Sequence, residues 1–158
     1  MENGLVSGIA FQKDQMKYTL HGVSDTPGIA YSILGPLSDA NIEVDVIVQN
    51  ISVDGKTDFT FTVSKEDEHA TSEVIKQMKN SLDFDDVIID SQIAKVSLVG
   101  VGMRTHAGIA STAFKALSEN DVNIQMISTS EIKITIVINE GAVTKAVKAL
   151  HEAFKLEK

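Results

Sequence analysis

The stretch Ser24-Asp25-Thr26-Pro27-Gly28-Ile29-Ala30 organises this chain, because the chain contains a version of it twice. The second version is Arg104-Thr105-His106-Ala107-Gly108-Ile109-Ala110, in which Gly-Ile-Ala returns 80 positions later (108 − 28). The apolar residues that follow each version share the spacing i, i+1, i+4, i+5 and i+8, which marks one face of an α-helix. These residues are Ile29, Ala30, Ile33, Leu34 and Leu37, and then Ile109, Ala110, Ala113, Phe114 and Leu117. Each copy therefore predicts a strand, a glycine turn and a helix.

The helix that opens at each glycine turn also predicts where a ligand binds. The first N–H groups of a helix have no partner inside the helix, and they carry partial positive charge. A small anion such as a carboxylate is therefore favoured at the turn.

Composition limits the possible functions. Apolar residues make up 43 % of the 158 residues and charged residues 23 %, which is ordinary for a globular chain with a core. The chain has no cysteine, so disulfides and thiolate metal sites are excluded, and its four scattered histidines predict no metal site. The net charge of −8 argues against nucleic acid or an anionic membrane as the main partner. Neither a membrane-spanning apolar run nor a signal peptide is evident, so we expect a cytoplasmic location.

The order of elements predicts the first domain. A polar turn is expected at Lys13-Asp14-Gln15, and Pro36 predicts a kink or an early end of the first helix. Alternation and helical spacing predict strands over 5–11, 17–23, 41–50, 58–63 and 85–90, with helices from Gly28 to about Asp39 and over 66–80. From residue 17 onward this order is βαββαβ.

The second copy repeats the order but stops one strand short. Lys95–Gly100 matches Lys17–Gly22 at an offset of 78 (95 − 17), and Asn123-Ile124 echoes Asn41-Ile42. A strand is predicted around residues 134–138 and a helix over 141–154. The N-terminal strand is the obvious substitute for the missing fourth strand. We therefore predict a first domain over 16–92 and a second over 1–15 plus 93–158, so that neither folds well without the other.

At this point the residues show a resemblance to a known family. Two βαββαβ units, each with a glycine-led turn after the first strand, resemble tandem ACT domains. Several strings resemble the regulatory region of aspartate kinase: Ser24-Asp25-Thr26-Pro27-Gly28, Val48-Gln49-Asn50-Ile51-Ser52, Lys95-Val96-Ser97-Leu98-Val99-Gly100 with Gly102-Met103, and Ile127-Ser128-Thr129-Ser130-Glu131-Ile132. The resemblance covers essentially the whole chain.

The resemblance implies an α+β fold of two ferredoxin-like ACT domains, with antiparallel sheets and helices on one face. It also implies a regulator that binds threonine, lysine or both and mediates feedback inhibition in biosynthesis of the aspartate family of amino acids. The amino-acid kinase domain that transfers phosphate from ATP to L-aspartate is absent, and no catalytic constellation, metal site or cofactor is expected in this chain. A catalytic aspartate kinase subunit or domain and a second copy, joined edge to edge, are the expected partners.

The resemblance also assigns site residues at the first turn. The amides of Gly28, Ile29 and Ala30 suit the carboxylate of a free amino acid, and Asp25 suits its ammonium. Gln49, at the end of the second strand, offers a donor and an acceptor. The backbone groups of Asn123 and Ile124 are implied to face the effector across a domain interface.

The second turn departs from the first, with Ala107 where the family frequently has proline and Thr105 in place of the acid. The resemblance nevertheless implies a lysine pocket there, with Glu131 meeting the lysine side chain. The positions matching that pocket are Met103, His106, Gly108, Ile109, Ser130 and Glu131.

Three other functions compete with this hypothesis. A free-standing tandem ACT sensor could regulate another enzyme, but the Ile127–Ile132 string speaks against it. An RNA-binding module shares the element order, but it stacks bases on strand aromatics, and this chain is acidic with only 5 % aromatics. A small ferredoxin-like hydrolase would need an arginine cradle for phosphate, and the chain has a single arginine, Arg104.

Overall fold

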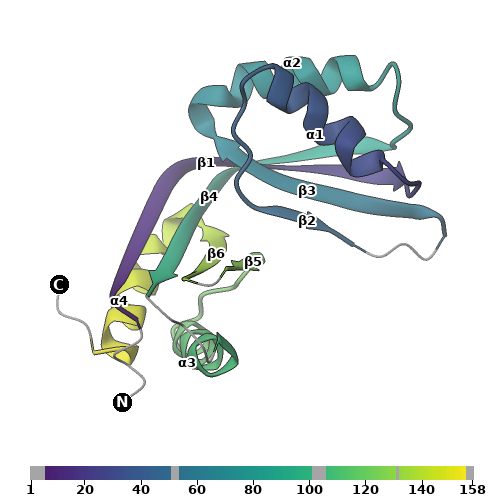
Figure 1. Cartoon of the computed structure of the whole chain (residues 1–158). Coiled ribbons are helices and arrows are strands. Elements are labelled where there is room, and N and C mark those ends of the chain that lie inside the picture. The colour runs from purple at the N-terminus through teal and green to yellow at the C-terminus, as the bar shows by residue number, and fades with distance from the viewer. Residues whose placement is uncertain (1–5, 51–53, 101–105, 131, 156–158) are drawn as a thin grey trace. The chain divides into compact units, whose positions relative to one another are not determined.

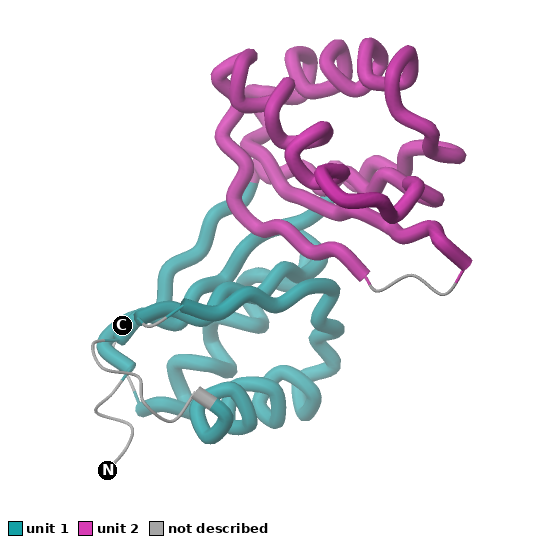
Figure 2. The backbone as a smooth tube through the Cα atoms, turned by 45° about the vertical axis from the view of Figure 1, so that its right-hand side comes forward, with its two compact units in different colours: residues 1–13, 92–158 teal, residues 14–91 magenta. Residues whose placement is uncertain are grey.

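Two compact units divide the chain in the computed structural model, which describes residues 6–50, 54–100, 106–130 and 132–155 (Figure 1). Unit 1 comprises residues 1–13 and 92–158, and unit 2 comprises residues 14–91 (Figure 2). Two long strands belong to both units: β1 (Gly8–Ser24) crosses from unit 1 into unit 2, and β4 (Asp86–Val99) crosses back. Each unit is therefore an α+β sheet with two helices, as the sequence predicted.

Unit 2 contains the first glycine turn. After β1 come α1 (Ile29–Asp39), β2 (Ile47–Gln49), β3 (Lys56–Ser64), the short η2 (Lys65–Asp67) and α2 (Glu68–Met78). The strand order is β2-β3-β1-β4, and β3 is antiparallel to both β1 and β2. Alternate strand residues pack with both helices in one core, so the helices cover one face of the sheet. This core contains Met16, Tyr18, Leu20, Phe59, Phe61 and Val63 from the strands, with Ile29, Ile33, Leu37, Ile75 and Met78 from the helices.

Unit 1 repeats this construction. Its elements are α3 (His106–Glu119), β5 (Met126–Thr129), β6 (Lys133–Asn139), η3 (Glu140–Ala142) and α4 (Val143–Ala153), with the strand order β1-β4-β6-β5. The core again joins alternate strand residues to both helices: Ala94, Val96, Leu98, Ile134, Ile136 and Ile138 pack with Ile109, Ala113, Leu117, Ala146 and Leu150. The helical spacing read from the repeat is thereby confirmed in both copies. Among the described residues, no helix is long and apolar enough to cross a membrane.

Two predicted breaks in the strands are wrong. Lys13-Asp14-Gln15 is part of β1 rather than a turn, and the separate strands predicted over 85–90 and 95–100 form the single strand β4. Asp14 has φ of 60°, and Gln15 is buried with 6 % of its surface exposed. The polar residues mark the passage of each strand from one unit to the other, and there the apolar alternation changes without the strand ending.

Two further expectations need correction. The strand predicted over 41–50 is reduced to β2 at Ile47–Gln49, although Asp45 N–H still donates to Thr62 O (3.0 Å) and Thr62 N–H to Val46 O (3.0 Å). Pro36 does not end α1 early, since the helix runs to Asp39 as its apolar spacing indicates. Pro36 has no N–H, so α1 lacks the hydrogen bond that this position would donate to Ser32 O, and the helix nevertheless continues to Asp39.

The correspondence of Asn123-Ile124 with Asn41-Ile42 is also wrong by two positions. The second residue after each helix has left-handed φ, Asn41 at 61° after α1 and Asp121 at 57° after α3. In both, the next residue donates to a leucine carbonyl: Ile42 to Leu37 (3.0 Å) and Val122 to Leu117 (2.9 Å). The offset of 80 (121 − 41) therefore persists through the helix end, and Asn123 corresponds to Glu43.

Tyr18 provides a test of the unit 2 core at high pH. Its side chain is fully buried, its hydroxyl donates to the carbonyl of Glu68 (3.3 Å), and burial raises its pKa above the usual 10.0. A raised pKa favours the protonated native state, so this contribution to stability is complete below pH 10 and is lost as the pH rises through the native pKa. Absorbance titration should show Tyr18, which is completely buried, ionising above its usual range and together with unfolding. Ionisation of Tyr18 near pH 10 while the protein stays folded would contradict this assignment.

Candidate functional site

The first glycine turn presents an uncapped helix N-terminus. Gly28 is the N-cap residue of α1 with φ of 88° and ψ of −1°, and it makes no side-chain capping bond. No acidic residue lies in the first turn of α1. A Cβ built at Gly28 would meet nothing within 4 Å, so the space above the turn is open. Apart from Ile29 N–H, which donates to Thr26 O (3.1 Å), the first N–H groups of α1 are therefore available to an anion from outside the chain.

One backbone hydrogen bond fixes the turn to the neighbouring hairpin. Asp25 N–H donates to the carbonyl of Gly55 (2.8 Å), which lies just before β3. Ile29 N–H donates to Thr26 O (3.1 Å), and the first helical bond runs from Ser32 N–H to Gly28 O (3.0 Å). The backbone of the turn is thus held in place, whereas the Asp25 side chain is exposed. A fixed backbone beside an exposed carboxylate is suited to a ligand that carries both a negative and a positive charge.

Gln49 lies on the same face of the sheet as α1. It pairs with Phe59 across β2 and β3, and directly paired residues point to the same face. Phe59 is a core residue beneath α1, so the Gln49 side chain belongs to the helix-covered face at the edge of the sheet. Gln49 is exposed, and no hydrogen bond joins its side chain to that of Asp25 among the described residues. Both side chains are therefore accessible to solvent.

The conformation of Gly28 leads to a test of the turn. Gly28→Ala should lower the free energy of unfolding by about 1–2 kcal/mol, because left-handed φ is unfavourable for a residue with a Cβ. Gly8→Ala is the matched control, since a Cβ there also meets nothing within 4 Å and its φ is not positive. Urea unfolding of both variants measures the difference. Equal stabilities would contradict a backbone role for Gly28.

The second turn is built differently. Gly108 is the third residue of α3 rather than its N-cap, and it is not among the described glycines with positive φ. Ile109 is buried in the unit 1 core, and Ser130 is exposed and donates its N–H to Lys133 O (2.7 Å). His106 begins α3, whereas Met103 and Glu131 lie outside the described residues. A second site that copies the first is therefore not formed at Gly108.

Asn123 and Ile124 line a separate hollow of about 540 Å³ in unit 1. It lies past the C-terminal end of α3, and its other walls are Phe114, Ser118, Asp121 and Val122. Gly108 stands in the first turn of that 14-residue helix, about 16 Å from its C-terminal end along the helix axis. Within unit 1 the structure therefore does not bring Asn123 together with Gly108.

Sequence reasoning missed Thr129 as a candidate. Thr129 pairs with the core residue Ile134, just as Gln49 pairs with Phe59, so it holds the equivalent place on the helix-covered face of unit 1. The offset of 80 (129 − 49) was the signal that could have found it.

A polar hollow on unit 2 was also missed. It contains His21, whose Nδ1 lies 2.8 Å from Asp58 Oδ1, and Lys56, whose Nζ lies 3.6 Å from Asp85 Oδ1. The same Asp58 oxygen accepts from Gly22 N–H (3.2 Å). Since these side chains contact one another, the hollow is explained by interactions within unit 2.

Comparisons with known proteins agree with this geometry. Models of the ACT domain match residues 19–83 and 96–154. An aspartate kinase of Pseudomonas fluorescens is 54 % identical over 157 residues, which is 99 % of this chain. The chain spans 38 % of the length of that relative. An aspartokinase of Helicobacter pylori is 48 % identical over the same extent.

Two solved structures of aspartate kinase subunits also match this chain, each over 99 % of its own length. A chain from the crystal structure of aspartokinase alpha and beta subunits is 48 % identical, with a TM-score of 0.89. The match covers 96 % of this chain and 99 % of that one. The ligand-free regulatory subunit of aspartate kinase from Thermus thermophilus is 32 % identical, also with a TM-score of 0.89, and 99 % of it is covered.

Proposed function

This chain belongs to the family of aspartate kinase regulatory regions built from two ACT domains, and we propose from this premise that it is an allosteric sensor of a free amino acid. The observation that carries the proposal is the uncapped N-terminus of α1, with left-handed Gly28 and open space above it. An amino-acid carboxylate supplies the negative charge that this terminus lacks.

The remaining groups of the ligand meet exposed side chains of unit 2. Asp25 binds the ammonium through a charge-assisted hydrogen bond. Gln49, on the helix-covered face, donates to or accepts from the polar side chain of threonine. Backbone groups of Asn123 and Ile124 complete the site across an interface, and Ser130, Glu131 and their neighbours bind lysine at the second turn.

Regulation follows from unequal binding. Threonine, lysine or both bind one arrangement of the parent enzyme better than another and so shift it to a less active state. The effect is feedback inhibition of phosphate transfer from ATP to L-aspartate, a reaction carried out by a catalytic part outside this chain.

The edges of both sheets support assembly of the sensor into a homodimer. β2 and β5 are the outermost strands of the sheet order, and each carries an exposed isoleucine. Ile47 in β2 is 43 % exposed, and Ile127 in β5 is 41 % exposed. Exposed apolar edge strands favour pairing with another chain. Joining of β2 and β5 edges between two copies would cover both isoleucines.

Calorimetric titration tests the function directly. The purified chain is titrated with L-threonine and then with L-lysine, and D-threonine serves as the stereochemical control. We expect saturable binding of L-threonine, L-lysine or both, with no heat from the control. A folded dimer that binds neither amino acid would overturn the proposal.

A further inference from the structure

A groove of about 1170 Å³ runs through unit 1 between the N-terminal part of β1 and α4. Its apolar walls include Phe11, which is 51 % exposed, and Val147. The residues that line it on the helix side extend from Val143, the first residue of α4, to Lys155, just past its end. The groove therefore follows the whole of this 11-residue helix, over about 16 Å, and it suits an elongated ligand.

The rim of the groove is basic. Lys148, His151 and Lys155 line it, and neither lysine forms an ion pair with another described residue. Of the described residues that line the groove, only Glu152 carries a carboxylate. Lys13 also lines the groove, but it already has an interaction within the chain, so the available charge comes from α4. On a chain with a net charge of −8, this rim is a local site for an anion.

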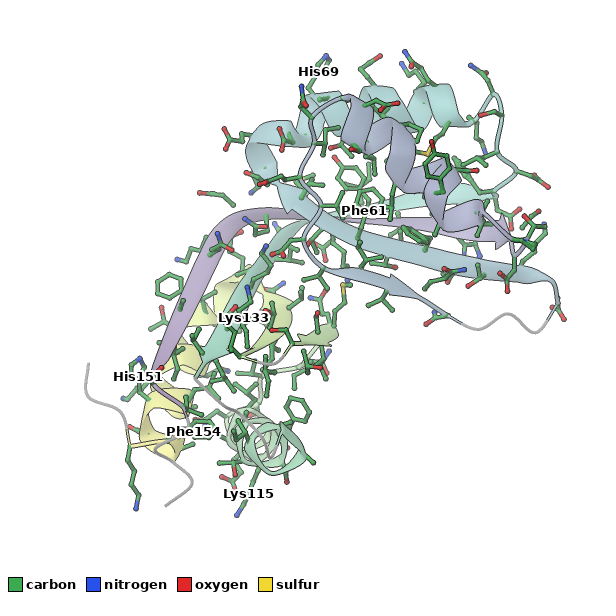
Figure 3. All side chains as sticks on the ribbon, in the orientation of Figure 1. Phe61, His69, Lys115, Lys133, His151 and Phe154 are labelled. Carbon is green, nitrogen blue, oxygen red and sulfur yellow. The ribbon has the colours of Figure 1, made fainter. Side chains whose placement is uncertain are left out.

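His151 also offers a hydrogen-bond donor to the groove. Its Nδ1 atom is buried and has no hydrogen-bond partner among the described residues. In a neutral imidazole one nitrogen carries the proton, and a proton on Nδ1 would be a buried donor without an acceptor. The proton is therefore better placed on Nε2, which can donate to a group in the groove that the ring lines. Figure 3 labels His151 on α4 beside the N-terminal end of β1.

The other half of the repeat shows that the fold itself does not require these side chains. Capped 3₁₀ turns precede both α2 and α4, and they align the two helices at an offset of 75 (143 − 68). At that offset Val147 and Lys148 of α4 correspond to Ser72 and Glu73 of α2. The apolar wall and the basic rim are therefore particular to α4.

We propose that this groove binds a small amphipathic anion, namely a carboxylate that carries an unbranched apolar chain. The chain packs against Phe11 and Val147, and the carboxylate accepts hydrogen bonds from Lys148, His151 and Lys155. The basic rim selects the negative head group, and the length of the groove along α4 selects an extended chain. This site lies in unit 1 and shares no residue with the first glycine turn of unit 2.

Calorimetric titration of the purified chain with laurate, kept below its micellar concentration, tests the proposal. We expect saturable binding. Octanoate should bind about tenfold more weakly or worse, because its shorter chain buries fewer methylene groups. Dodecyltrimethylammonium has the chain length of laurate but a positive head group, and it should show no saturable binding.

Charge reversal at the rim identifies the site. Lys148→Glu combined with Lys155→Glu should weaken laurate binding about tenfold or more, because the carboxylate then meets like charges. Lys115→Glu combined with Lys145→Glu is the matched control, since it changes the net charge equally at exposed lysines that do not line the groove. This control should bind laurate as the wild-type chain does. Phe11→Ala should also weaken binding, and thermal unfolding checks that every variant is folded.

The proposal is overturned if laurate shows no saturable binding, if dodecyltrimethylammonium binds equally well, or if the rim variant keeps wild-type affinity. Cosedimentation of the chain with phosphatidylglycerol vesicles, without binding of free laurate, would assign the groove to a membrane surface and would overturn it as well. L-threonine titration of the rim variant should match that of the wild-type chain, because the first turn belongs to unit 2. Failure of laurate binding would therefore leave the amino-acid sensor unaffected.

Discussion

Replacement of Phe61 by alanine is expected to lower the free energy of unfolding by about 3–5 kcal/mol. Phe61 is completely buried at the centre of unit 2, where its ring stacks on Tyr18 with centroids 5.6 Å apart and lies 6.3 Å from the ring of Phe59 (Figure 3). Truncation removes these contacts and leaves a cavity between the sheet and both helices.

Tyrosine fluorescence and circular dichroism during urea unfolding measure this loss. Both tyrosines of the chain, Tyr18 and Tyr31, lie in unit 2, whereas circular dichroism reports on both units. The two signals should change together, because β1 and β4 are shared by the units and neither sheet is complete alone. Phe11→Ala is the control, and its loss should stay below about 1 kcal/mol, since half of that ring is exposed. A comparable loss in the control, or separate transitions in Phe61→Ala, would contradict the account.

Loss of the polar groups around the first turn should have the largest effect on ligand binding. Asp25→Ala is expected to weaken L-threonine binding at least tenfold, since a hydrogen bond to a charged group contributes about 1.5–3 kcal/mol and tenfold corresponds to about 1.4 kcal/mol. Gln49→Ala removes a neutral hydrogen bond of about 0.5–1.5 kcal/mol and is expected to weaken binding about two- to tenfold. Both side chains are exposed, so neither substitution should change the unfolding midpoint.

Gln77→Ala on α2 is the matched control, because it removes an exposed amide on another element of the same unit. Calorimetry of the three variants measures binding, and thermal unfolding checks that each is folded. Undiminished affinity in both Asp25→Ala and Gln49→Ala would exclude the first turn as the effector site.

The fold could be predicted from the sequence because the apolar spacing within each helix or strand shows which of its faces is buried, and the repeat shows this twice. Ile29, Ile33 and Leu37 recur at helical spacing, and Phe59, Phe61 and Val63 alternate, so one buried face is evident in each element. The passages of β1 and β4 between units could not be read in this way. At Asp14 and Gln15 the surroundings of the strand change from one unit to the other, and polar residues there imitate a turn.

The candidate site was predictable only in part. Gly28 was identifiable because a helix N-cap with left-handed φ requires glycine. The different start of α3 was not, since Gly108 has the same sequence neighbours as Gly28 but lies inside the first helical turn. The position of Asn123 depended on the left-handed residue Asp121 at the helix end, which alternation alone does not reveal.

The most direct measurement of the central claim is the shift of backbone amide resonances in a ¹⁵N-labelled chain during titration with L-threonine. A carboxylate at the N-terminus of α1 must perturb the N–H groups that bind it, so the largest shifts should occur at Gly28, Ile29 and Ala30, with smaller shifts at Gln49. Saturable binding that leaves these amides unchanged and shifts residues elsewhere would show that the turn is not where the ligand binds.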